Sequence, residues 1–251
     1  MKNTMDFPFT VSALCFVALW FSARVGFFFA KSRPLQDDQR DDFNVVQAGA
    51  LTLLGLLIGF TFSMAIGRYD QRKNYEEAEA NAIGTEYVRV DVLPAADAAR
   101  LRELLRRYVD LRVLFYTAHN GQQLQQINAD TAKLQNQLWS AVEVDAPVQP
   151  TPLTALALAG MNDVLNSQGY TQAAWWNRIP LEAWVLLVLI SVGCNMLIGY
   201  GAHRRSALFI VLPLAVSVSF FLIADIDSPR GGIIRVQPQN LISLARGLTP
   251  Q

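Results

Sequence analysis

The apolar residues of this chain gather in four long blocks separated by polar segments. The blocks are Phe9–Ala30, Val45–Gly67, Ile179–Tyr200 and Ala207–Ile226. Each is close to the roughly 20 residues that a helix needs to cross the hydrocarbon core of a bilayer. The first is too long for the apolar stretch of a signal peptide, so we read it as a retained membrane helix. The pattern predicts an all-α, polytopic membrane protein with four transmembrane helices.

These blocks divide the chain into four parts. Residues 1–67 carry spans one and two, 68–178 form a helical cytoplasmic region, 179–226 carry spans three and four, and 227–251 form a cytoplasmic tail. Four spans place both termini on one side, and a modest excess of Lys and Arg near the span ends favours the cytoplasm for that side. The basic residues on that side are Lys2, Arg68, Arg72, Lys73, Arg178, Arg230 and Arg235, against Lys31, Arg33, Arg40, Arg204 and Arg205 on the other.

The middle segment has the pattern of amphipathic helices with short breaks. Pro94 ends the helix that leaves the second span, because a proline disfavours helix in the residue before it. Apolar side chains then recur at helical spacing from 101 to 115 and from 124 to 138, which indicates core packing. Four arginines of the first of these helices form a solvated face or contact anionic lipid headgroups. They are Arg100, Arg102, Arg106 and Arg107.

Residue types that carry catalysis or metal binding are sparse. His119 and His203 lie in different loops with no cysteine or carboxylate at ligand spacing, and Cys15 and Cys194 lie inside spans. The sequence has no phosphate-binding, dinucleotide-binding or nucleophile-elbow motif. We therefore expect no enzyme activity, no cofactor and no metal site. The formal net charge of zero also argues against nucleic acid as a partner.

Ionisable residues in or beside the spans need separate explanations, because burying charge in lipid is costly. Arg24 lies inside the first span, and its side chain can extend toward the membrane surface near Lys31. Asp225 and Asp227 close the fourth span just before a Pro-Arg-Gly-Gly stop signal. Two carboxylates are too few to predict a Ca²⁺ site, which needs about six or more oxygen ligands.

A cluster of acids follows the second span. Glu76, Glu77 and Glu79 lie beside Arg72 and Lys73 on one predicted helix. Opposite charges three or four residues apart commonly pair along a helix. We expect such pairs here rather than an acid–base dyad.

The second block differs from a simple membrane anchor. Small and hydroxyl residues are spread through its apolar sequence, and they suit close helix packing or a polar-lined path through the membrane. These residues are Gly55, Gly59, Thr61, Ser63 and Gly67.

Several phrases of the sequence resemble the bacterial bestrophin-like family of membrane proteins. They are GLLIGFTFSMAIGRYDQRK, EANAIGTEYVRVDVLP, LRELLRRYVDLR, NRIPLEAW and DIDSPRGGIIRVQPQNL, which together extend over most of the chain. The second span is also distantly similar to that of the bestrophin ion channels, with Gly59-Phe60 and Arg68-Tyr69 at matching positions. The resemblance implies a homo-oligomer, pentameric in bestrophins, that passes small inorganic ions across the bacterial inner membrane.

The same resemblance suggests which residues line the pore. The bestrophin constriction uses bulky apolar residues four apart on the second span, and the matching positions are Thr52, Leu56 and Phe60. Because Thr52 is polar, a two-ring neck of Leu56 and Phe60 is the safer expectation. Ser63 and Gly67 continue the same helical face. The alternative is that this face packs against other spans of the same subunit. The bestrophin calcium clasp after the fourth span has no full counterpart here.

Small residues also predict a packing face beyond the second span. Ala78 and Ala82 share one face of the predicted helix, and Asn81 can bridge to a neighbouring backbone. Small residues let helices approach closely, within a chain or between subunits. Alternatively, alanine merely supports helix formation.

Two functions follow from these patterns. The first is an oligomeric ion channel with its pore lined by the second span. The alternative is a non-conducting membrane scaffold or sensor whose helical cytoplasmic region binds a partner.

Overall fold

The computed structural model describes residues 7–118, 120–143, 151–202 and 208–248. Lys2, His119, His203, Arg204 and Arg205 lie outside these residues. Within them the chain is helical and contains no β-strand, which confirms the predicted all-α class. Four helical stretches of this part are long and apolar enough to cross a membrane, as the sequence predicted.

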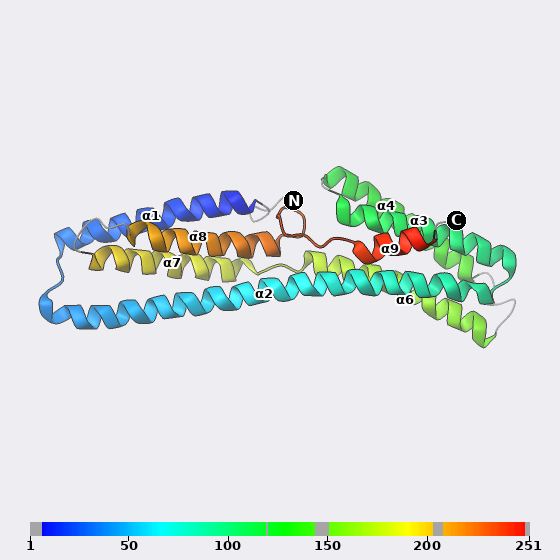
Figure 1. Ribbon diagram of the computed structural model, residues 1–251, viewed down its shortest axis with the longest axis horizontal. Coiled ribbons are helices and arrows are strands. Elements are labelled where there is room, and N and C mark those ends of the chain that lie inside the picture. The colour runs from blue at the N-terminus through cyan, green and yellow to red at the C-terminus, as the bar shows by residue number, and fades with distance from the viewer. Residues whose placement is uncertain (1–6, 119, 144–150, 203–207, 249–251) are drawn as a thin grey trace. The chain divides into compact units, whose positions relative to one another are not determined.

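The chain divides into two compact units. The first comprises residues 1–69 and 178–235, and the second comprises 70–177 and 236–251. The long helix α2, Arg40–Arg89, contributes its first part to the first unit and its last part to the second (Figure 1).

The first unit contains the four spans. Its helices are α1 (Pro8–Ser32), the first part of α2 after the short 3₁₀ turn η2 (Asp37–Gln39), α7 (Leu181–Gly201) and α8 (Leu208–Asp227). Helix α1 packs along α7 and α8, as Figure 1 shows. The core includes Leu54 of α2, Leu187 of α7 and Phe220 of α8, each exposed by 2% or less.

Two glycines allow the close approach of α1 and α7. A Cβ at Gly26 would lie 2.9 Å from the carbonyl carbon of Met196, and a Cβ at Gly199 would lie 2.8 Å from that of Ala23. Both distances are shorter than any normal carbon–carbon contact, so each glycine faces the backbone of the other helix. This is the small-residue packing typical of membrane helices.

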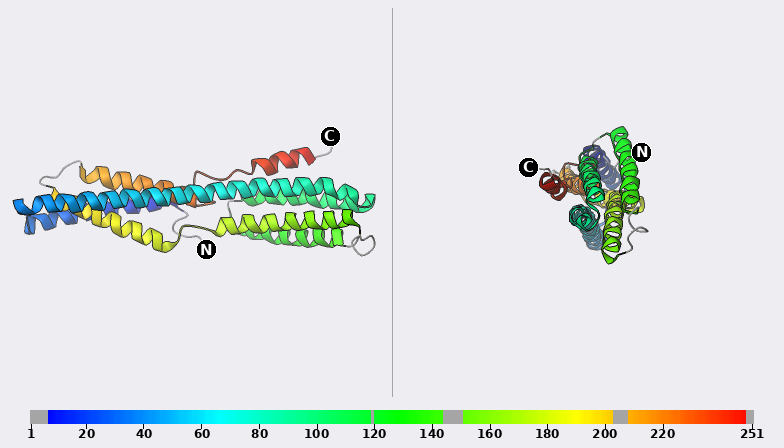
Figure 2. Two further views of the ribbon diagram at one scale, coloured as in Figure 1. Left: turned by 90° about the horizontal axis from the view of Figure 1, so that it is seen from below. Right: turned by 90° about the vertical axis from the view of Figure 1, so that its right-hand side faces the viewer.

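The second unit is a bundle of helices around an apolar core. Its elements are the last part of α2, η3 (Val90–Val92), α3 (Ala95–Thr117), α4 (Gly121–Glu143), α6 (Pro152–Trp176) and α9 (Gln239–Leu248). Helix α4 packs on α3, and Figure 2 shows this pair from two further directions. The predicted stripes supply the core, with Leu101, Leu105 and Tyr108 of α3 and Leu138 of α4 fully buried. Thr151 caps α6, accepting a 3.1 Å hydrogen bond from the backbone N–H of Thr154.

Candidate functional site

The first part of α2 buries one side and exposes the other. Between Asp42 and Arg68 the helix carries no charge, so the sequence is apolar all round and does not mark a core-facing stripe. Leu54, Thr61 and Ala65 lie on the buried side.

The opposite side of this helix is not covered by any of the residues that the structure describes. All five residues predicted to line a pore lie there, namely Thr52, Leu56, Phe60, Ser63 and Gly67. Leu56 is 52% exposed and Phe60 is 63% exposed, large fractions for such apolar side chains. Among residues 7–118, 120–143, 151–202 and 208–248, their face is therefore not packed against another span.

Several polar and small residues on the exposed side of this part of α2 have no packing role among the described residues. Thr52 donates a 2.9 Å hydrogen bond from its hydroxyl to the Ala48 carbonyl oxygen, so its polarity is satisfied along the helix. A Cβ placed at Gly55, Gly59 or Gly67 would meet no atom within 4 Å. Their small size leaves open space on the uncovered side.

A buried carboxylate links three elements where the spans of the first unit end. Asp227, the last residue of α8, is 2% exposed. Its Oδ1 lies 3.7 Å from Arg68 Nη1 on α2, and its Oδ2 lies 3.6 Å from Arg178 Nε. The backbone N–H of Ile179, just before α7, also donates to both carboxylate oxygens at 3.2 and 3.3 Å. Arg68 and Arg178, which the sequence analysis used as indicators of membrane topology, thus form ion pairs within the unit.

Asp225 shapes the turn that follows α8. Its two carboxylate oxygens accept hydrogen bonds from the backbone N–H groups of Ile233 and Ile234, at 2.7 and 2.8 Å. A Cβ at Gly232 would lie 2.9 Å from Asp225 Oδ1, so this position has room only for glycine. Asp225 thus accepts hydrogen bonds from backbone N–H groups, whereas Asp227 contacts a backbone N–H group and two arginines. The described residues contain no cluster of three or more potential metal ligands.

The last part of α2 carries a charged rather than apolar buried side. Its buried positions follow the heptad spacing of four and three residues, which keeps them on one side of the helix. They are Arg72, Glu76, Glu79, Ile83 and Glu86, and Val90 at the start of η3 continues the spacing, each exposed by 1% or less.

Glu79 forms an ion pair with Arg112 of α3, and both side chains are fully buried. Thr171 of α6 donates a 3.1 Å hydrogen bond to Glu79 Oε2. Burial by itself lowers the pKa of Arg112, but the nearby Glu79 charge outweighs it and raises that pKa. The Arg112 guanidinium also lies 4.4 Å from the centre of the Phe115 ring. These contacts join α2, α3 and α6.

Glu76 caps the N-terminus of α9. Its Oε1 accepts a 2.9 Å hydrogen bond from the Leu241 backbone N–H, and its Oε2 accepts one of 2.7 Å from the Asn240 side chain. A carboxylate is favourable there because the first N–H groups of a helix have no partner within it. The expected pairing of Glu76 and Glu79 along α2 is wrong, because their partners lie on other helices.

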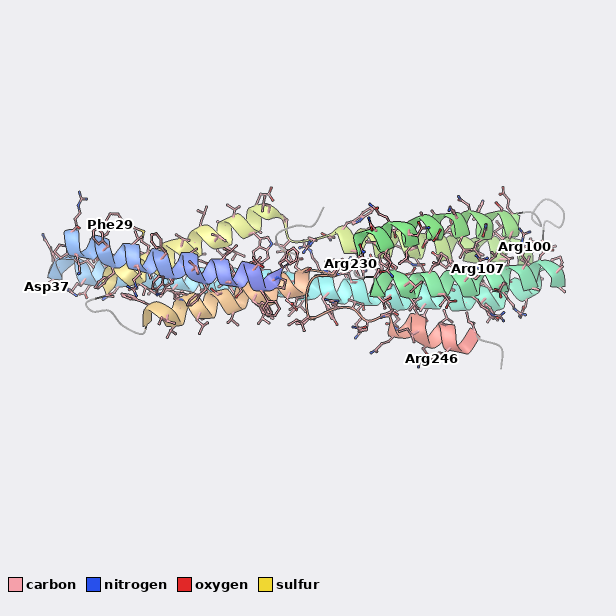
Figure 3. All side chains as sticks on the ribbon, turned by 90° about the horizontal axis from the view of Figure 1, so that it is seen from above. Phe29, Asp37, Arg100, Arg107, Arg230 and Arg246 are labelled. Carbon is pink, nitrogen blue, oxygen red and sulfur yellow. The ribbon has the colours of Figure 1, made fainter. Side chains whose placement is uncertain are left out.

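The arginines of α3 have different surroundings. Arg102 pairs with Asp91, while Arg106 donates to Tyr87 Oη at 2.7 Å and to the Leu248 carbonyl at 2.8 Å. The remaining two, Arg100 and Arg107, are exposed, and Figure 3 labels both on α3. The predicted solvated face therefore fits Arg100 and Arg107, whereas Arg102 and Arg106 are half-buried and hold specific partners. Arg24 of α1 also differs from expectation, because its guanidinium lies 4.5 Å from the Trp20 ring centre rather than toward Lys31.

The predicted packing residues of α2 are only partly covered inside the chain. Ala78 and Asn81 are exposed and Ala82 is half-buried. An open groove of about 610 Å³ lies between this part of α2 and α9, and Asn81 is one of its lining residues.

Comparisons with known proteins agree with this architecture. The chain is similar to crystal structures of a bacterial bestrophin homologue from Klebsiella pneumoniae. One variant with a tryptophan replaced by alanine has 10% identity over 99% of this chain and 98% of that chain, with a TM-score of 0.68. A second structure has 12% identity over 96% of each chain, with a TM-score of 0.66. At such low identity the likeness shows the shared fold.

No curated protein matches the chain. The model of the Bestrophin-like domain family matches residues 12–241, which is most of the sequence. The chain therefore belongs to the Bestrophin-like domain family.

Proposed function

We propose that the protein is an oligomeric ion channel of the bacterial inner membrane, with its pore lined by the first part of α2. The observation that supports this most directly is the uncovered face with Leu56 and Phe60. These side chains lie one turn apart on a charge-free helix whose other side packs in the core of its unit. A ring of copies around a central axis would bring these faces together. The family and the shared fold support the same arrangement.

The order of residues along this face fits a hydrophobic constriction. Leu56 and Phe60 would form its narrow part, Thr52 would line the pore one turn before them, and Ser63 and Gly67 would widen it further along the helix. A bulky apolar ring restricts ion flow by excluding water, and small residues beyond it leave room for hydrated ions. Residues 1–67 and 179–226 would then carry the four spans. Residues 68–178, the tail 227–251 and both termini would lie in the cytoplasm. A homopentamer is the expected assembly, by resemblance to the bestrophins.

Conductance measurements test this proposal. The purified protein is first assigned an oligomeric state in detergent and is then reconstituted into planar bilayers. Leu56→Ala and Phe60→Ala should each raise the conductance because they widen the ring. The matched control is Leu189→Ala on α7, a leucine that is 64% exposed and lies on a different span. Its conductance should equal that of the wild type.

Two results would contradict the channel. A correctly assembled oligomer that passes no current, even after Leu56→Ala, would favour the non-conducting scaffold or sensor. Equal effects of Leu56→Ala and Leu189→Ala would show that the uncovered face of α2 faces lipid.

A further inference from the structure

Three carboxylates lie on the buried side of α2 in the second unit, and two of them have hydrogen-bond or ion-pair partners. Glu76 accepts hydrogen bonds from the N-terminus of α9, and Glu79 has Arg112 and Thr171. The third, Glu86, is fully buried, and both of its carboxylate oxygens are without a hydrogen-bond partner in the described structure. Buried polar groups in proteins nearly always have partners, so this exception needs an explanation.

The position of Glu86 depends on a glycine of α6. A Cβ at Gly160 would lie 3.0 Å from Glu86 Cδ and would overlap its Oε2, so the carboxyl fills the space that the glycine leaves. Helix α6 runs antiparallel to this part of α2, because Glu79 contacts Thr171 and Glu86 contacts Gly160. The carboxyl is therefore enclosed at a helix–helix contact.

A cation lies near Glu86, since Arg89 Nη1 would be 2.7 Å from a Cβ at Gly160, but neither oxygen of Glu86 has a hydrogen-bond partner among the described residues. Arg89 is one turn further along α2, and Asp163 lies on α6. On η3, Asp91 is already paired with Arg102 of α3. Burial raises the pKa of Glu86 to about 8, Arg89 partly opposes this rise, and Asp163 adds to it. At Glu76 and Glu79 hydrogen-bond donors satisfy the carboxylate oxygens. At Glu86 a bound proton removes the charge instead.

We propose that Glu86 is a proton-binding site that controls how closely α6 packs on α2. The neutral carboxyl fits against Gly160. After the proton is lost to solvent, the carboxylate is repelled by Asp163 and attracted by Arg89, and burial without donors becomes costly. The side chain then leaves its enclosed position, and α6 loosens around Gly160. This site does not depend on whether the protein conducts ions.

Infrared spectroscopy of the purified full-length protein tests the proton itself, because a protonated carboxyl has a carbonyl stretch distinct from that of a carboxylate. The wild type should show such a band at neutral pH and lose it with a midpoint near the pKa of about 8. Glu86→Gln should lack the band. Glu77→Gln is the matched control, since Glu77 lies on the same helix and is exposed. An unchanged band in Glu86→Gln would overturn the proposal.

Gly160→Ala provides a second, independent variant. The added methyl occupies the space of the Glu86 carboxyl, so the band should be lost at neutral pH although Glu86 is still present. A band that stays with the wild-type midpoint would show that Gly160 does not enclose the carboxyl.

Hydrogen exchange tests the coupled change in packing. For a pKa of about 8, the ionised fraction of Glu86 rises from about a tenth at pH 7 to about nine tenths at pH 9. After correction for the chemical exchange rate, the amides of α6 around Gly160 should exchange faster at the higher pH in the wild type. In Glu86→Gln they should not change. Equal exchange in both proteins at about pH 9 would show that proton loss leaves the helices in place.

Discussion

Arg68 on α2 and Asp227 at the end of α8 lie 3.7 Å apart between Nη1 and Oδ1, and the carboxylate is almost completely buried. The pair fixes the end of the candidate pore helix to the last residue of another span. Arg178 approaches the same carboxylate from the segment before α7. One acid therefore holds together three of the four membrane helices of the unit at the same end.

Asp227→Asn should destabilise the protein substantially. The change removes the negative charge but keeps the size of the side chain, so two guanidiniums remain beside a neutral amide. Breaking a buried ion pair typically costs about 3–5 kcal/mol of unfolding free energy. Thermal unfolding of the purified protein in detergent measures the effect. Asp70→Asn, an exposed acid on α2, is the control and should change stability by no more than about 0.5 kcal/mol. Similar losses in the two variants would disprove the structural role of Asp227.

Gly26→Ala and Gly199→Ala should each loosen the contact between α1 and α7. Either methyl would run into the backbone of the facing helix, and overpacking of this kind costs about 1–3 kcal/mol. The matched control lies on α7 itself. Gly193 has open space around its Cβ position, so Gly193→Ala should be neutral or stabilise the helix by up to about 1 kcal/mol. Unfolding midpoints that fall equally in all three variants would refute the close contact.

Local patterns were sufficient to predict the helices. Length, hydrophobicity and period are properties of neighbouring residues, so the four spans and the apolar stripe of α3 follow from the sequence. The break before α4 also follows from a local turn signal at Asn120-Gly121. The exposed side of α2 could not be identified in this way, because a helix that is apolar all round has no amphipathic stripe.

Contacts between distant residues were the part that the sequence did not show. Glu79 has cations six and seven positions earlier on the same helix, in Lys73 and Arg72, yet it pairs with Arg112, 33 residues away. The choice depends on burial, because Arg112 is enclosed with Glu79 where no water competes. One signal was available: Arg112 continues the stripe of apolar residues on α3, which places a charge on the buried side.

Glu86 should make the stability of the protein depend on pH in a defined direction. Its pKa is about 8 in the folded protein against an ordinary value of 4.5. Below the lower value the carboxyl is protonated in both states and contributes nothing. Between the two values the folded protein binds a proton that the unfolded chain has lost, so stability falls as pH rises, and above about 8 the loss is complete.

The measurement compares unfolding midpoints of the wild type and Glu86→Gln between about pH 5 and pH 9. The difference should grow in favour of the variant up to about pH 8 and then stay constant. Glu77→Gln should follow the wild type throughout. Parallel curves for the wild type and Glu86→Gln would mean that the folded protein keeps Glu86 ionised.

Ala82→Leu tests whether the small residues after the second span pack between subunits. Ala82 is half-buried within the chain, and its neighbours Ala78 and Asn81 are exposed, so most of the room for a larger side chain is on the outer side of α2. If another subunit covers this side, the added bulk should cost about 1–3 kcal/mol and weaken assembly. The readout is the oligomer fraction in detergent together with the unfolding midpoint.

Ala78→Leu strengthens the test, because this residue is exposed in the single chain and any loss of oligomer reports a contact between copies. Variants that assemble and unfold like the wild type would show that this face is open to solvent and that alanine there only supports the helix.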